Sequence, residues 1–174
     1  MQDRVIFGSD NGKSGWLVFL DIETASIVHI EQYRNDAKRL SELLSTFKPV
    51  YAVSEEVFMS SGFKGVASTD YQIMGRYSQC FEMLDIPYHF IRAVSWRPKV
   101  GIKGKGRDQL KQLAIQKAKE LFSEEDYRKL HWTHRVRRDG HLVEITEPDN
   151  NMCESALIAY YALQYWRNDY VKRT

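Results

Sequence analysis

Val50-Tyr51-Ala52-Val53-Ser54-Glu55-Glu56-Val57-Phe58-Met59 is the stretch that decides the fold. It begins with apolar residues that are typical of a buried strand, and it then reaches two carboxylates, Glu55 and Glu56. Because an uncompensated charge inside a strand is costly, we expect both acids where the strand ends. Acids at the end of a central strand commonly belong to a site, although a solvated acidic turn is the alternative.

Acidic residues also stand at the ends of two other predicted elements. Asp10 follows the apolar run Val5–Ser9, and Asp149 and Glu154 open the last helical stretch. Three separated segments that each deliver a carboxylate at an element end indicate one convergent acidic pocket.

Each of these acids also has a simpler interpretation. Asp10 precedes Asn11-Gly12, and such a sequence is favourable in a hairpin turn. Asp149 would suit the positive end of a helix dipole. With Asn151 as the N-cap, Glu154 would complete a capping box.

Hydrophobic periodicity and turn residues divide the whole chain into strands and helices. We predict strands over residues 4–9, 16–20, 26–32, 50–53 and 87–92, and helices over 36–47, 69–84, 107–122, 124–130 and 150–167. Asn35 or Asp36 should cap the first helix. The strand-helix-strand order around it implies a crossover, so the fourth strand should lie parallel to the first. The prediction is an α/β fold with a mixed five-stranded sheet and helices on both faces, in a single domain over residues 1–174.

A β-hairpin is predicted over residues 131–146, because apolar and polar residues alternate around Asp139-Gly140. Arg135 and Arg137 lie two apart and should share one face of the first strand. We expect them to contact a phosphate backbone, with Trp132 stacking or anchoring the hairpin. The alternatives are a solvated decoration, or a dimer contact through the apolar residues Trp132, Val136, Leu142 and Ile145.

Charge is distributed unevenly along the chain. The net charge of +2, with 43% hydrophobic and 28% charged residues, is ordinary for a globular protein. Residues 97–119, however, carry eight Lys or Arg against one acid, Asp108. Basic segments beside carboxylates fit a polyanion such as DNA that must reach a metal. Candidates for DNA contact are Lys64, Lys103, Lys105, Arg107 and Lys111, although a solvated helix face is the usual reason for a charge run.

The two cysteines, Cys80 and Cys153, indicate a reducing compartment and not a disulfide scaffold. The apolar run after the N-terminus is too short for a signal peptide, and Ala156–Leu163 is too short to span a membrane. We therefore expect a soluble cytoplasmic protein with no membrane partner.

Carboxylates without softer ligands favour hard cations, Mg²⁺ or Mn²⁺ as its substitute. Two such ions about 4 Å apart can activate a water and stabilise the leaving oxygen in phosphodiester cleavage. In such a site Asp10 would lie between the ions, Glu55 would bind one of them, and Asp149 with Glu154 would bind the other. A zinc site from His131, His134, His141 and Cys153 is the weaker alternative, because its spacing fits no zinc motif. A phosphate-binding P-loop is excluded at Gly101–Gly106, where no Lys-Ser or Lys-Thr follows.

Four short motifs in this order resemble RuvC-like Holliday junction resolvases over nearly the whole chain. Gly8-Ser9-Asp10-Asn11-Gly12-Lys13-Ser14-Gly15 is similar to the family's Gly-x-Asp-Pro-Gly-x-x-x-Gly opening, with Asn11 in place of Pro. Glu55–Met59 is similar to the second motif, and Glu154–Ala159 to the last one. Trp96 and Gly104–Asp108 resemble the Trp and Gly-Lys stretch of phage-type members.

The resemblance implies a ribonuclease H-like fold and a homodimeric, Mg²⁺-dependent endonuclease that nicks two strands of a four-way DNA junction. It makes Glu55 the catalytic acid of the second motif and places Phe58 where the family stacks an aromatic ring on bases; a core Phe is the alternative. The resemblance is also compatible with a phage-encoded protein that acts in a host cell. Family members usually carry another Asp or His three or four residues before the final acid. Those positions are Asn151 and Asn150 here, so either Asp149 or Asn150 completes the site.

Three functions compete on this sequence. The first is an endonuclease that resolves Holliday junctions or other branched DNA by paired cleavage. The second is a related nuclease that acts on flaps, forks or RNA–DNA hybrids. The third is a catalytically impaired module that binds branched DNA, against which the three carboxylates at motif positions argue.

Overall fold

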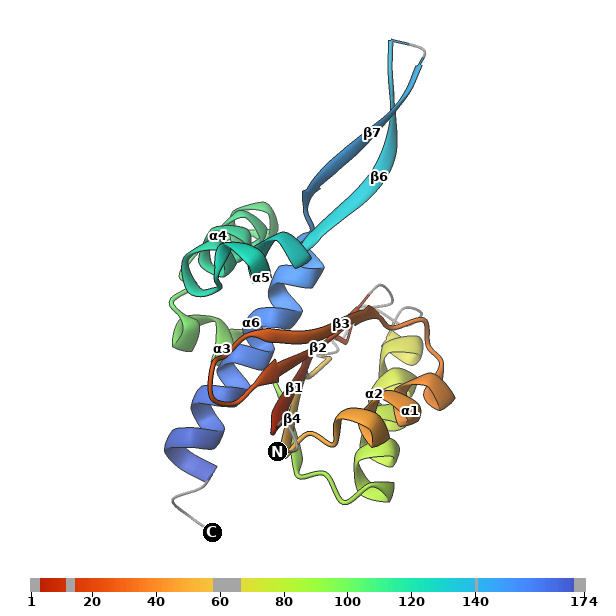
Figure 1. Cartoon of the computed structure of the whole chain (residues 1–174), viewed down its shortest axis with the longest axis vertical. Coiled ribbons are helices and arrows are strands. Elements are labelled where there is room, and N and C mark those ends of the chain that lie inside the picture. The colour runs from red at the N-terminus through yellow and green to blue at the C-terminus, as the bar shows by residue number, and fades with distance from the viewer. Residues whose placement is uncertain (1–3, 12–14, 58–66, 140, 171–174) are drawn as a thin grey trace.

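The centre of the fold is a five-stranded mixed sheet in the order β3-β2-β1-β4-β5 (Figure 1). The structure, a computed structural model, describes residues 4–11, 15–57, 67–139 and 141–170. The strands are β1 (Val5–Ser9), β2 (Trp16–Asp21), β3 (Ile27–Gln32), β4 (Tyr51–Glu55) and β5 (Tyr88–Ile91). The three N-terminal strands form an antiparallel meander, and β4 and β5 add to it in parallel.

The predicted parallel pairing of the first and fourth strands is confirmed. Ile6 pairs with Tyr51 and Ser9 with Ser54 in the β1–β4 register. Both strands therefore end at the same edge of the sheet, where Asp10 follows β1 and Glu55 is the last residue of β4. The carboxyl ends of parallel strands are the usual place for a ligand site in such folds.

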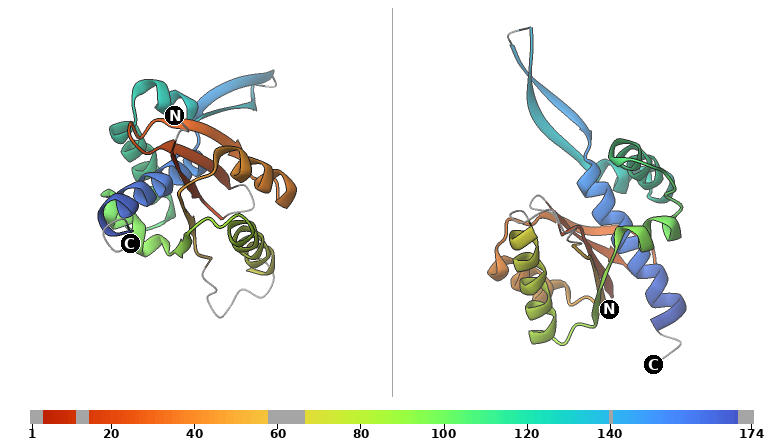
Figure 2. Two further views of the ribbon diagram at one scale, coloured as in Figure 1. Left: turned by 60° about the horizontal axis from the view of Figure 1, so that its bottom comes forward. Right: turned by 180° about the vertical axis from the view of Figure 1, so that it is seen from behind.

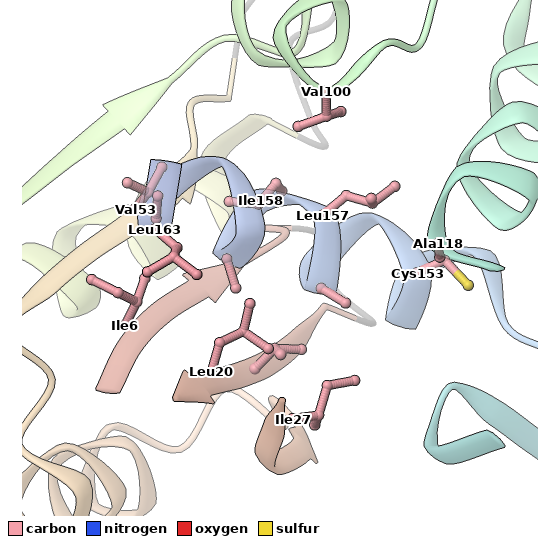
Figure 3. Packing of buried hydrophobic residues seen from close by; sticks show 14 of the residues in the cluster. Ile6, Leu20, Ile27, Val53, Val100, Ala118, Cys153, Leu157, Ile158 and Leu163 are labelled. Atoms are coloured by element: carbon pink, nitrogen blue, oxygen red, sulfur yellow. The ribbon is translucent and has the colours of Figure 1, made fainter. Parts of the chain in front are cut away.

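Helices cover both faces of the sheet, as predicted (Figures 1 and 2). The two on one face are α1 (Ala37–Phe47) and α2 (Ala67–Met83), which bury an aromatic core around Phe7, Phe19 and Tyr77. On the other face lies α6 (Asn150–Tyr165), backed by α4 (Arg107–Leu121), over an aliphatic core (Figure 3). The remaining helical segments are α3 (Ala93–Trp96), η1 (Arg97–Val100), α5 (Glu124–Lys129) and the π-helical turn η2 (Trp166–Tyr170).

The helix α6 is buried more completely than its sequence pattern predicted. The pattern indicated one inward face, with Tyr161 and Tyr165 among the inward residues, but both of these are partly exposed. Every residue from Met152 to Ala159 is buried instead. The reason is that α6 lies between the sheet and α4, so two opposite sides of the helix are covered. Within the described residues, no helix is long and apolar enough to cross a membrane.

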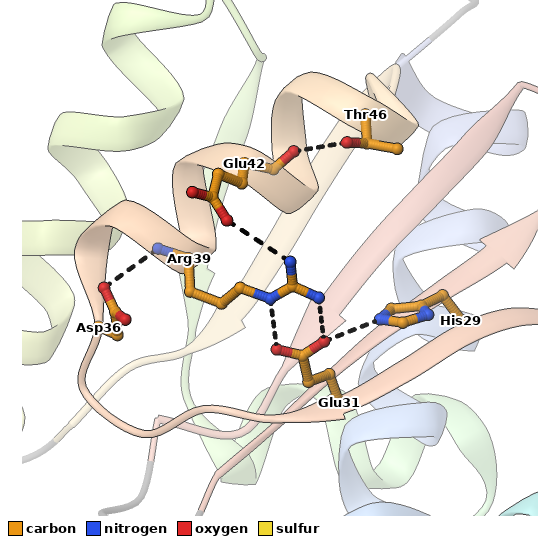
Figure 4. A network of polar contacts seen from close by, with 6 residues as sticks. All are labelled: His29, Glu31, Asp36, Arg39, Glu42 and Thr46. Carbon is orange, nitrogen blue, oxygen red and sulfur yellow. Dashed lines mark hydrogen bonds and ion pairs between the residues drawn. The ribbon is translucent and has the colours of Figure 1, made fainter.

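The helix α1 is capped by Asp36, one of the two predicted residues, whose Oδ1 accepts a bond from the backbone N of Arg39 at 3.1 Å. The guanidinium of Arg39 reaches the edge strand β3, where Nε and Nη2 donate to the two carboxylate oxygens of Glu31 at 2.8 and 2.7 Å (Figure 4). Arginine and carboxylate thus meet in a bidentate pair, which fixes α1 against the sheet edge.

The predicted hairpin is present as β6 (His131–Arg138) and β7 (His141–Pro148), a separate two-stranded ribbon that projects away from the sheet and its helices (Figures 1 and 2). It runs to Pro148, two residues beyond the predicted end, because Pro148 and Glu147 still pair with His131 and Trp132. At its base the Trp132 ring packs edge-on against Trp16, with ring centroids 5.4 Å apart. Trp132 therefore anchors the ribbon to the start of β2.

The strand β1 and the helix α6 approach each other most closely at Gly8. A Cβ atom added to Gly8 would lie 2.2 Å from the backbone N of Ala159 and 2.5 Å from its Cβ. No side chain fits there, so glycine at this position allows α6 to lie directly on the central strand.

We predict that Gly8→Ala destabilises the protein by about 3 kcal/mol or more, because the new methyl group meets backbone that cannot move alone. Gly75→Ala is the matched control, since a Cβ at Gly75 inside α2 meets nothing within 4 Å. The control should stabilise the protein by about 0.5 to 1 kcal/mol through the higher helix propensity of alanine. Urea denaturation of both variants measures the difference, and equal stabilities would contradict the close approach.

Candidate active site

The ends of β1 and β4 are tied together by buried polar side chains. The amide Nδ2 of Asn11 donates to the backbone oxygen of Glu55 at 2.7 Å. The hydroxyl of Ser54 lies 3.0 Å from Asn11 Oδ1 and 3.2 Å from the backbone oxygen of Ser9, within donating distance of both. Asn11, which replaces the proline of the RuvC-like motif, therefore holds the two strand ends by hydrogen bonds in place of a rigid ring. These bonds position Asp10 and Glu55 on adjacent strands.

The helix α6 brings a third carboxylate to the same edge. The backbone N of Asp10 donates to Ser155 Oγ at 3.1 Å, so the turn after β1 is bound directly to the helix. The preceding residue on the helix, Glu154, is buried and points its carboxylate to Arg97. The structure thus places Asp10, Glu55 and Glu154 near enough for the charges of Asp10 and Glu154 to act on Glu55.

Two consecutive residues hold two of these carboxylates. The indole Nε1 of Trp96 donates to Glu55 Oε2 at 2.8 Å, and Arg97 Nη2 donates to Glu154 Oε1 at 2.7 Å. Trp96 is fully buried, and the Arg97 guanidinium lies over its ring at 5.4 Å from the centroid. The short α3–η1 segment therefore sets where both acids point.

The pKa of Glu55 is raised to about 7, chiefly by burial and next by the neighbouring charge of Asp10. The hydrogen bond from Trp96 and the positive charge of Arg97 oppose this shift, whereas Glu154 adds to it. Such a shift means that the fold holds like charges together at a cost, which is common where carboxylates are gathered for chemistry.

Asp149 has a structural task in this arrangement. It is the N-cap of α6, and its Oδ1 accepts bonds from the backbone N of Asn151 at 2.8 Å and of Met152 at 2.9 Å. The simpler interpretation of Asp149 as a residue of the helix start thus describes its contacts. The capping box with Asn151 as N-cap is wrong, because the N-cap is Asp149, two residues earlier, and Glu154 binds Arg97 instead.

Asp10 and Glu55 open into a pocket of about 490 Å³, and the residues that line it are Asp10, Asn11, Glu55, Glu56, Val57, Asp70, Arg92, Ala93 and Val94. The types of ligand atom at this edge suit a hard divalent cation, since carboxylate and amide oxygens converge on it. In arrangement the fit is incomplete: among the described residues, no three His, Cys, Asp or Glu side chains are grouped as a metal site. Glu55 and Glu154 are instead bound to Trp96 and Arg97.

The zinc alternative has no support in the described part of the chain, where His131, His134, His141 and Cys153 form no such group. Cys153 is buried, and burial raises the pKa of its thiol to about 12, with the charges of Asp149 and Glu154 adding to the shift. A thiol with so high a pKa is a poor ligand and nucleophile at neutral pH.

A second hollow adjoins the acidic pocket. Ala93 and Val94 line both, and the second one continues past Arg97 to Lys103 and Gly104. Lys105 and Arg107 are exposed beside it, and Lys111 is partly exposed. Of the predicted basic contacts of this segment, Lys103 lines this hollow, and Lys105, Arg107 and Lys111 follow it in the chain. Phe58 and Lys64 lie outside the described residues.

The hairpin is less basic than its first strand indicated. Arg135 Nε donates to Glu144 Oε1 at 3.0 Å across the ribbon, and the strand register places Arg137 opposite Leu142. Leu142 thus shares the face of the two arginines, whereas Trp132, Val136 and Ile145 lie on the opposite face. The predicted apolar set is therefore split between the two faces.

Comparisons with known proteins agree on the architecture. No protein-family model and no curated protein matches the sequence. Among solved structures, Thermus thermophilus RuvC in complex with a Holliday junction substrate matches with a TM-score of 0.65 and 13% identity, over 95% of this chain and 96% of that one. The chain has the RuvC fold. A second T. thermophilus RuvC structure matches with a TM-score of 0.62 and 16% identity, over 94% of this chain and 95% of that one. The yeast mitochondrial Holliday junction resolvase Ydc2 matches with a TM-score of 0.50 and 18% identity, over 99% of this chain and 85% of that one.

The order of the motifs along the chain fits the RuvC fold. The structure also shows which residues of the site the sequence interpretation missed. Asn11 and Ser155 were expected only as a substituted turn residue and a helix residue, yet both build the site. Arg97 was counted as one basic residue among eight. Its position directly after the motif tryptophan was the available signal.

We predict that the stability of the protein depends on pH through Glu55. Its pKa is higher in the fold than in the unfolded chain, so this contribution is complete below about pH 4.5 and is lost as the pH rises to about 7. Glu55→Gln removes the titrating group. The variant should therefore gain about 3 kcal/mol relative to the parent between pH 4.5 and pH 8. Denaturation curves in EDTA at both pH values test this, and a pH-independent difference would exclude the raised pKa.

Proposed function

We propose that this protein is a metal-dependent, structure-selective DNA endonuclease that resolves Holliday junctions or other branched DNA by paired phosphodiester cleavage. The observation that carries the proposal is the convergence of Asp10, Glu55 and Glu154 at the carboxyl edge of β1 and β4 in the RuvC fold. Among its structural neighbours is a RuvC complexed with a Holliday junction substrate.

The cofactor of this proposal is Mg²⁺, with Mn²⁺ as a substitute. Asp10, Glu55 and Glu154 would hold it, together with Asp149 or Asn150. When bound, the cation would supply charge stabilisation for the phosphate and lower the pKa of an attacking water. Within the chain, Asn11 and Ser155 orient the Asp10 segment, and Trp96 orients Glu55. If Asp149 is the fourth ligand, its carboxylate would have to serve the helix start and the site together.

The DNA is proposed to follow the basic path beside the acids. Lys103, Lys105, Arg107 and Lys111 would contact its backbone, because phosphate contacts supply most of the affinity for DNA. Arg135 and Arg137 are proposed to add contacts from the hairpin, and Phe58 and Lys64 from the segment after β4. Paired cleavage of a junction with two-fold symmetry needs two active sites, so we propose a homodimer.

We predict that Asp10→Asn and Glu55→Gln each lower cleavage by orders of magnitude, whereas junction binding persists. Both acids would hold the cation, while binding rests on phosphate contacts. The assay presents four-way junctions, forks, flaps, RNA–DNA hybrids and linear duplex with Mg²⁺, and gel-shift measurements record binding. Symmetric paired nicks restricted to junctions support the proposal. Full activity of either variant would refute the site, and cleavage of forks, flaps or hybrids alone would favour the related nuclease.

A further prediction concerns the hairpin. Replacing Arg135, Arg137 and Arg138 together with Ala should weaken junction binding and flatten its salt dependence, since each lost phosphate contact removes about one unit of slope. Because Arg135 is paired with Glu144, its share should be smaller than that of Arg137. Fluorescence anisotropy at a series of salt concentrations measures the slope. An unchanged slope, together with a monomer in ultracentrifugation, would assign the hairpin to the dimer interface.

A further inference from the structure

The starting observation is that Trp96 and Arg97, neighbours in the chain, bind two different acids of the cluster. Trp96 reaches Glu55 and Arg97 reaches Glu154, at 2.8 and 2.7 Å. The Glu154 side chain is 11% exposed and that of Arg97 is 21% exposed. This ion pair is therefore largely withdrawn from water, unlike the exposed pair of Arg92 with Glu56 at the rim of the same pocket.

One nitrogen of the Arg97 guanidinium lacks a hydrogen-bond partner among the described residues. Its Nε is buried and has no hydrogen-bond partner among the described residues. The group is held by one carboxylate oxygen and by the face of the Trp96 ring. A buried donor without a partner costs free energy, so this position depends strongly on the negative charge beside it.

The hydrogen bond of Arg97 uses an oxygen that a cation would need. Oε1 of Glu154 accepts it, and the described acids are not grouped as a metal site in this arrangement. A guanidinium and a divalent cation cannot share one carboxylate oxygen at full strength, because both are positive and both need close contact.

We propose that Arg97 is the internal counter-ion of the acidic cluster, and that Glu154 exchanges Arg97 for the cation when the site is loaded. The exchange would free the guanidinium toward the second hollow, which Arg97 lines together with Lys103 and along which the DNA backbone is proposed to run. Arg97 is thus a positioning residue that passes from a carboxylate to a phosphate. This inference rests on the proposed metal-dependent nuclease.

Removal of Arg97 should change the affinity for the cation in one particular direction. Removing Arg97 removes the competitor of the cation and leaves the acids more negative. Cation binding should therefore become tighter, although cleavage should fall. A residue that merely supported the structure would weaken both.

The experiment is calorimetric titration of the full chain with Mn²⁺ alone, without DNA. Arg97→Gln should bind Mn²⁺ about tenfold more tightly than the parent, because a nearby opposing charge has effects of this size. Arg97→Lys, which keeps the charge, should stay close to the parent. Arg92→Gln is the control, since it removes one positive charge from the rim of the acidic pocket, where Arg92 binds Glu56. Its affinity should change far less than that of Arg97→Gln.

Unchanged or weaker Mn²⁺ binding by Arg97→Gln, with the parent binding normally, would overturn the counter-ion and leave the nuclease intact. No Mn²⁺ binding by the parent would instead refute the metal site itself. If Arg97→Gln does not fold, the Nε–H resonance of Arg97 in the parent, assigned with Arg97→Lys, is followed during titration with Mg²⁺. A shift of this signal larger than that of Arg92 supports the exchange, and an unmoved signal contradicts it.

Discussion

The site depends on one close contact, the approach of α6 to β1 at Gly8 and Ala159. Because no side chain separates the helix from the strand, Ser155 reaches the backbone of Asp10, and Glu154 arrives at the sheet edge beside it. A helix kept further from the strand by even one methyl group could not make both contacts in this geometry. The packing of a glycine thus determines the position of a carboxylate about one and a half helical turns away, by way of a rigid element.

A cluster of acids assembled in this way has an electrostatic cost. Three carboxylates in a half-buried place repel one another, and the raised pKa of Glu55 is a direct expression of that repulsion and of burial. The chain lowers the cost locally, with an indole donor on Glu55 and a guanidinium on Glu154, both from one short segment. A cation would lower it more effectively, because its two charges act on all the oxygens it contacts.

The sequence predicted the fold well where local patterns and topology agree. Apolar runs located all five strands, and the strand-helix-strand order around α1 determined the parallel pairing of β1 with β4. It placed Asp10 and Glu55 at strand ends for the same reason, whereas Glu154 lies inside the first turns of α6. It did not predict which partner each acid has. The bond of Arg97 to Glu154 joins residues that are 57 positions apart, and only the packing of η1 against α6 brings them together.

The hairpin illustrates the same limit. Its first strand alone is rich in arginine, but the strand register adds Glu144 and Glu147 from the second strand, and Asp139 lies in the turn. Three acids then balance Arg135, Arg137 and Arg138, so the ribbon as a whole carries no excess charge at neutral histidines. An isolated two-stranded ribbon is marginally stable, and this one has cross-strand bonds between Thr133 and Thr146 and between Arg135 and Glu144. At its base, Trp132 packs on Trp16, and the backbone N of Asp149 donates to Leu130. The second anchor lies at the start of α6, so the base of the ribbon is bonded directly to the helix that carries Glu154.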